Sequence, residues 1–194
     1  MNLQLEAMAL AMPDVVGHPN RLSFRGVLTL VGVASLRAPN GARGHRVMLT
    51  RAATDAALPS LLGMALDYAP SLDSHDVRRK IGIITEANIE PLRPARLPNS
   101  PDKGGAPDRR ITGQLVISGY LFAHDFPEVV DEIRGQGSGP TSTLGMSYEM
   151  TEVEIPNQNT SIWTATAFTF TGAAVLRRDK AAYPQTWIEV ATSN

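Results

Sequence analysis

The amino-acid sequence predicts an α+β fold that is mostly β, with two or three helices. Several segments rich in Val, Ile and Leu alternate between apolar and polar residues, turn-forming Gly and Pro residues separate them, and only two stretches have a helical pattern. Strands at this spacing favour a barrel or a packed sheet. With 194 residues, 43% of them apolar, the chain can bury a core in one domain. We assign an irregular segment to 1–20, a single domain to 21–190 and a tail to 191–194.

The strands are expected where alternating or β-branched runs end in turn signals. They are residues 24–36, 45–50, 80–85, 111–121, 142–155 and 162–171. Between them, residues 89–110 contain five prolines and two adjacent glycines, which neither a core strand nor a helix can carry. We therefore expect an exposed loop there.

Two helices are expected. Residues 54–64 have a helical pattern with Thr54 or Asp55 as the N-cap. Residues 125–137 have the stronger pattern: Asp125 is expected to cap the helix and Glu128 occupies the capping-box position. Apolar residues of this second segment recur at helical spacing, which indicates one buried face.

Composition excludes several classes of function. The 18 basic and 19 acidic residues nearly balance, so we expect no nucleic-acid partner. The absence of cysteine rules out disulfides, thiolate metal sites and cysteine nucleophiles. No apolar run is long enough to cross a membrane, and the N-terminal residues lack the basic region of a secretory signal. We therefore expect a cytoplasmic protein.

The histidines offer few candidates for chemistry. His18 and His45 are expected at the surface, whereas His75 and His124 are each followed by an aspartate. Those two pairs could in principle bind a metal, but His124 belongs to a predicted helix start and no metal-binding motif supplies further ligands. We therefore expect neither a metal nor another cofactor.

Ser147 is the most informative serine. Alternation along 144–150 places Gly145, Ser147 and Glu149 on the less apolar face of a strand, and the alternation breaks before Val153, which predicts a bulge. The segment is not the nucleophile elbow of α/β-hydrolases, because a strand follows the serine instead of a helix. From spacing alone, an ordinary outward-facing serine is the more frequent case.

Two segments resemble a known family. Leu72-Asp73-Ser74-His75-Asp76, followed by Lys80-Ile81-Gly82-Ile83-Ile84, is similar to the histidine segment of the prohead (capsid maturation) proteases of tailed phages, and Thr143-Leu144-Gly145-Met146-Ser147-Tyr148-Glu149 resembles their serine segment. The small residues of 172–176 follow in the order that the family shows. The resemblance covers roughly residues 24–189.

This resemblance implies a distorted β-barrel of the herpesvirus assemblin type and a serine endopeptidase, with Ser147 as the nucleophile and His75 as the general base. The expected substrates are the phage scaffold protein, extensions of the major capsid protein and the protease itself, inside the assembling prohead in the host cytoplasm. The resemblance does not fix the oligomeric state, and a homo-oligomer is one of the expected forms.

The residue that should orient His75 is missing from the expected position. Relatives place an acidic residue or a second histidine in the strand after the serine, where this chain has only threonines within 168–171. Thr169 and Thr171 are ranked first as substitutes, before His124 or a backbone carbonyl. Asp76 is a poor candidate because it would point away from its neighbour His75 in an extended segment. Arg177 and Arg178 could correspond to the family's oxyanion arginines, but an ordinary charged surface is favoured.

Two other functions are compatible with the sequence. One is a non-catalytic virion or scaffold-associated protein that retains the protease fold. The other is a β-rich binding module, in which His75 and Ser147 should not lie near one another.

Overall fold

A curled antiparallel and parallel sheet forms the body of the protein, whose computed structural model describes residues 7–13, 15, 17–92 and 112–191. The prediction of a mostly-β α+β fold is confirmed. Within these ranges seven strands follow one another in the order β10 (Trp187–Val190), β2 (Leu22–Val31), β6 (Gly113–Leu121), β5 (Lys80–Pro91), β4 (Ala65–Tyr68), β9 (Ala167–Arg177) and β7 (Leu144–Glu154). A short strand, β1 (Ala7–Ala9), pairs with β5.

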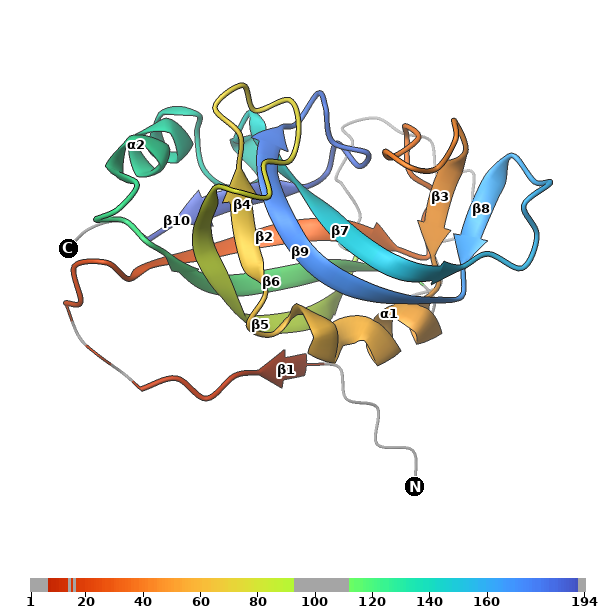
Figure 1. The fold of residues 1–194 in the computed structure, drawn as a ribbon, viewed down its shortest axis with the longest axis horizontal. Helices are drawn as coiled ribbons and strands as arrows, with labels where there is room; N and C mark the ends of the chain where they lie inside the picture. Colours follow the sequence, from red (N-terminus) through yellow and green to blue (C-terminus); the bar gives the residue numbers. More distant parts are fainter. Residues whose placement is uncertain (1–6, 14, 16, 93–111, 192–194) are drawn as a thin grey trace, which may run out of the picture.

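The sheet curls into a half-barrel, because β7 at one end approaches β2 and β10 at the other (Figure 1). Its concave side holds the main core, which includes Leu28, Leu66, Ile117 and Phe170. Beside the curled sheet, β3 (Arg46–Leu49) and β8 (Ile162–Ala165) form a separate parallel pair. Most neighbours are antiparallel, whereas β4 and β9 run parallel.

Two helices accompany the sheet in the described ranges. Helix α1 (Arg51–Ala57) continues into a 3-10 turn over Leu58–Leu61, where Pro59 fits, and packs against β9. Its N-cap is Thr50, whose hydroxyl accepts a hydrogen bond from Ala53 N at 3.2 Å. The prediction of Thr54 or Asp55 as the cap is wrong: Thr54 is buried within the helix, and Asp55 pairs with Arg51 one turn back.

Helix α2 (Pro127–Gly135) buries the apolar face that the sequence predicts, but its predicted cap is wrong. Phe126 occupies the N-cap position without a side-chain hydrogen bond. Pro127, which has no N–H to satisfy, begins the helix instead of Asp125. Glu128 does not complete a capping box and lies 3.0 Å from Arg79 Nη2.

Several strand boundaries differ from the prediction. β2 ends at Val31, before Gly32, whose φ of 70° turns the chain out of the strand. β5 extends to Pro91, with Ile89 buried opposite Leu115, so the first residues of the predicted 89–110 loop belong to a strand. Residues 93–110 of that loop lie outside the described residues.

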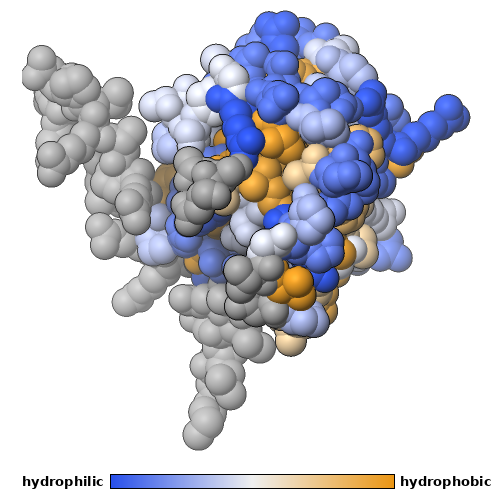
Figure 2. Space-filling view, turned by 90° about the vertical axis from the view of Figure 1, so that its left-hand side faces the viewer, coloured by the Kyte–Doolittle hydropathy of each residue, from blue (hydrophilic) through white to orange (hydrophobic). Residues whose placement is uncertain are grey.

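The surface shown in Figure 2 is mainly hydrophilic, with a small group of apolar residues exposed between polar ones. No helix within the described part of the chain is long and apolar enough to span a bilayer.

Candidate functional site

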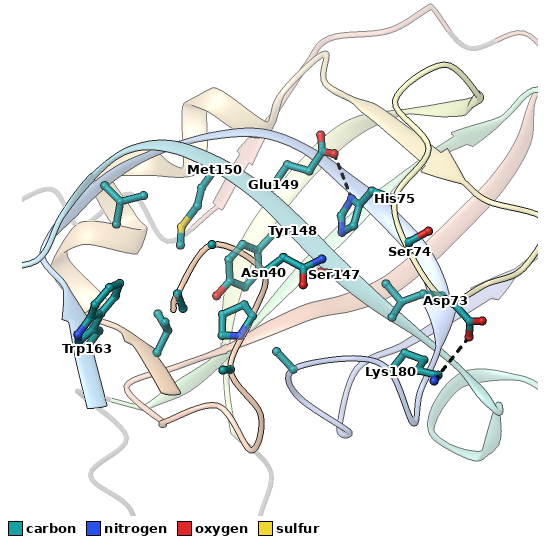
Figure 3. Close-up of a pocket in the computed structure, with 18 of the residues that line it drawn as sticks. Asn40, Asp73, Ser74, His75, Ser147, Tyr148, Glu149, Met150, Trp163 and Lys180 are labelled. Atoms are coloured by element: carbon teal, nitrogen blue, oxygen red, sulfur yellow. Dashed lines mark ion pairs between the residues drawn. The ribbon is translucent and has the colours of Figure 1, made fainter. Parts of the chain in front are cut away.

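Ser147 and His75 line the same cleft, although 71 residues separate them in the sequence. Ser147 lies on β7, opposite Ala174 of β9. His75 lies in the loop of residues 69–79, which connects β4 to β5. Figure 3 shows Ser147 on the wall of the cleft. The His75 ring is directed toward Glu149, which lies on β7 like Ser147. The fold therefore brings together the two residues that the sequence singles out.

The cleft has a volume of about 590 Å³, within the range typical of ligand sites. It combines apolar walls with a polar end at His75. Besides Ser147 and His75, its lining includes Asn40, Asp73, Tyr148, Met150, Trp163 and Lys180. Trp163 is held by stacking on His45, with the ring centroids 4.4 Å apart. A space of this size and character could hold several residues of an extended peptide.

Strand β7 explains how Ser147 comes to face the cleft. The predicted alternation holds along the first part of the strand, where Leu144 and Met146 are buried and Ser147 is partly exposed. The predicted bulge is also confirmed, because the pairing with β9 shifts after Glu149 and again after Thr151. Gly145 does not leave space for a substrate: a methyl group there would come within 2.7 Å of the Thr186 hydroxyl.

Two carboxylates approach the same ring nitrogen of His75. Its Nδ1 atom lies 3.1 Å from Glu149 Oε1 and 3.6 Å from Asp67 Oδ2. Neither contact meets the geometry of a hydrogen bond. Burial of the ring disfavours its charged form, but Asp67 and Glu149 outweigh that cost and raise the pKa of His75 above its ordinary value. Because both carboxylates lie on the Nδ1 side, Nε2 is left for another partner.

Asp67 is the most deeply buried group of this site. Its side chain on β4 has no exposed surface, and its Oδ1 accepts a hydrogen bond from Asp76 N at 3.4 Å. Lys80 Nζ lies 3.5 Å from Oδ2 and partly balances the charge. The backbone N–H of Asp76 thus supports Asp67, while the Asp76 side chain accepts a hydrogen bond from Arg78 N at 3.0 Å.

The side chains that the sequence analysis ranked as substitutes for the orienting residue make their contacts away from His75. Thr169 donates a hydrogen bond to Glu152 Oε2 at 2.9 Å, and Thr171 is exposed on β9. The His124 side chain is 77% exposed and lies near Asp125. The ranking of the threonines is wrong, because the carboxylates beside His75 are those of Asp67 on β4 and Glu149 on β7.

The sequence analysis assigned no role to either carboxylate, although each carries a signal in the sequence. Glu149 lies two residues after Ser147, so strand alternation already places both on one face. Asp67 belongs to β4, which the sequence analysis did not predict. An aspartate enclosed between Leu66 and Tyr68, just before a turn, is the signal that could have marked it as a buried polar residue.

Arg177 and Arg178 lie at a second cleft and do not line that of Ser147. Arg177 pairs with Asp179 through two contacts of 2.9 and 2.7 Å. Arg178 donates to the carbonyl oxygens of Pro140 and Gly139. These contacts favour a structural role for both arginines over the oxyanion role.

Comparison of the chain with protein-family models, with curated proteins and with solved structures finds no significant match. The assignment of a function to this site therefore depends on its geometry and on the segments quoted above.

Proposed function

We propose that the protein is a serine endopeptidase in which Ser147 is the nucleophile and His75 the general base. The single observation that carries this proposal is the meeting of both residues in one cleft, with carboxylates on the Nδ1 side of the histidine. A serine nucleophile needs a base beside it and a group that orients the base. Ser147 and His75 line one cleft, and Asp67 and Glu149 lie beside Nδ1 of His75, which supports the assignment of these roles.

In the proposed reaction, Ser147 Oγ attacks the carbonyl carbon of a peptide bond while His75 Nε2 accepts the hydroxyl proton. The protonated ring then gives this proton to the departing amine, and water hydrolyses the acyl-enzyme by the reverse order of transfers. Glu149 and Asp67 stabilise the imidazolium because they lie on the opposite side of the ring. They are positioning residues that act through His75: Asp67 is fully buried, and Glu149 also lines the cleft.

The wider proposal is a prohead maturation protease with a distorted barrel of the assemblin type. The curled sheet and the resemblance of residues 72–84 and 143–149 support it. Its substrates would be the phage scaffold protein, the extensions of the major capsid protein and the chain itself, within the prohead in the host cytoplasm. The cleft volume of about 590 Å³ supports the proposal that the substrate is an extended peptide segment.

Self-cleavage tests this proposal. We expect the purified, chelator-treated chain to shorten on standing, and Ser147→Ala to stop the shortening without unfolding the protein, since the serine is only partly buried. Thr151→Ala, an exposed change on the same strand, serves as the control and should shorten like the wild type. Intact-mass spectrometry measures the shortening of the wild type and of both variants.

If Ser147→Ala shortens at the wild-type rate, the nucleophile is wrongly assigned. If the wild type cleaves neither itself nor a scaffold protein, the non-catalytic virion protein becomes the better account.

A further inference from the structure

Three potential metal ligands meet at one end of the cleft. Asp67, His75 and Glu149 each offer one ligand atom, and these atoms all lie within 4.8 Å of one another. They come from β4, from the loop that follows it and from β7, so the tertiary fold alone assembles them. One imidazole and two carboxylates form a donor set suited to Zn²⁺.

The buried carboxylate of Asp67 is a second, independent observation that points to a cation site. The Asp67 side chain has no exposed surface, yet its Oδ2 has no hydrogen-bond partner among the described residues. A buried charge without such a partner is costly, and a bound cation removes that cost. Oδ2 faces His75 Nδ1, which also lacks a hydrogen-bond partner in the described part of the chain.

The two distances from His75 Nδ1 to the carboxylate oxygens suit a tetrahedral ion. Ligand atoms at 2.0–2.1 Å from a tetrahedral Zn²⁺ lie about 3.4 Å from one another. The distances from His75 Nδ1 to Glu149 Oε1 and Asp67 Oδ2, 3.1 and 3.6 Å, bracket this value. His75 and Glu149 are each about one-fifth exposed, so an ion can enter from the cleft. Three protein ligands leave the fourth position to water.

Lys80 is the competing cation at this site. Its Nζ lies 3.5 Å from Asp67 Oδ2, and its side chain is 36% exposed. A lysine with that exposure can turn toward solvent when an ion binds. Lys80→Met, which keeps the apolar stem and removes the charge, should therefore strengthen metal binding.

We propose that Asp67, His75 and Glu149 bind one Zn²⁺ ion and that this ion holds the protein inactive. The inhibitory part rests on the proposed protease function, whereas the binding part does not. Coordination through Nδ1 leaves the ring proton on Nε2, the atom that must accept the proton of Ser147. A zinc-loaded His75 therefore cannot act as the general base.

Titration of the chelator-treated full chain with Zn²⁺, followed by calorimetry, tests the binding part. We expect one ion per chain. Glu149→Gln and Asp67→Asn should each weaken binding by more than about tenfold, since loss of even an outer-shell partner typically costs 10–100-fold. His124→Ala, which removes an exposed histidine next to Asp125, is the control and should bind like the wild type.

The binding part is overturned if the wild type binds no zinc, or if Glu149→Gln and His124→Ala bind equally well. Glu149 is partly exposed, so this variant keeps the test valid even if Asp67→Asn does not fold.

Self-cleavage with and without zinc tests the inhibitory part. Cleavage by the chelated protein that stops on addition of Zn²⁺ supports it, and cleavage unchanged by bound zinc overturns it. If zinc binds but the chelated protein never cleaves, the protease proposal fails while the metal site stands. If the chelated protein cleaves but binds no zinc, the metal site fails while the protease proposal stands.

Discussion

His75 is the residue at which burial and charge act in opposite directions. Its ring is largely enclosed, which would favour the neutral form, yet two carboxylates lie within 3.6 Å of Nδ1. Their attraction wins and raises the pKa of the ring. A general base in this setting keeps its proton to higher pH than a free histidine does, and its conjugate acid is stabilised for transfer to the leaving amine.

The pH dependence of cleavage follows from this shift. Only the neutral ring can accept the serine proton, so kcat/KM of chelator-treated protein should rise with pH along a limb centred above the ordinary histidine value of about 6.5. Glu149→Gln removes one carboxylate that raises the pKa, and its limb should move to lower pH. A limb centred below the ordinary value, or one unmoved by Glu149→Gln, would contradict the assignment of His75 as the base.

At the scale of the elements, strands β7 and β9 position the site together. The residues of β9 that face the site segment of β7 are small: Gly172, Ala173 and Ala174 lie opposite Glu149, Tyr148 and Ser147. At Gly172 a methyl group would come within 2.9 Å of Glu149 Oε2. The small residues therefore leave room for the functional side chains.

Gly172→Ala should disturb catalysis more than folding. The new methyl group meets the end of a flexible side chain, so the fold can adapt while the Glu149 carboxylate shifts away from His75. We expect kcat to fall several-fold with KM nearly unchanged, and the melting temperature to change little. Gly135→Ala, where a methyl group meets nothing within 4 Å, is the control. A large loss of stability with unchanged kcat in the folded fraction would refute this role.

The sequence predicts the elements that carry their own local signal. The apolar face of α2, the alternation at the start of β7 and the bulge before Val153 can be predicted from the sequence, because each depends on neighbouring residues. Helix caps were misassigned where Thr50 and Pro127 offered better starts than the predicted residues. β4 and β10 were missed, because their place in the sheet depends on pairing with strands that are distant in the sequence.

The complete site could not be predicted for a related reason. Ser147 and His75 belong to segments with recognisable residues around them, whereas Asp67 acquires its position only from the pairing of β4 with β5 and β9. Such long-range pairing has no local signature. The sequence therefore indicates two members of the site, and the fold adds the carboxylates.

At the scale of the whole molecule, the site depends on the curled sheet that brings β4, β7 and the loop of residues 69–79 together. Leu66 is fully buried in β4, next to Asp67. Its side chain belongs to the same core as Phe170 and Leu28, on strands from both halves of the sheet. Loss of packing in this core should therefore weaken both the fold and the placement of Asp67.

Leu66→Ala should destabilise the protein by about 2–5 kcal/mol, the usual cost of such a truncation in a packed core. Val77→Ala, whose side chain is 63% exposed in the loop that carries His75, should stay within about 0.5 kcal/mol of the wild type. Urea unfolding measures both free energies. Equal effects of the two variants would contradict the described core.

The central claim is that the fold turns Ser147 into a nucleophile, and labelling by a fluorophosphonate tests it most directly. Such reagents form a covalent bond with a serine that has an activated hydroxyl. The account predicts one adduct per chain, located on Ser147 by peptide mass spectrometry, and strong loss of labelling in His75→Ala. No adduct on folded, chelator-treated protein, or an adduct on a different serine, would contradict it.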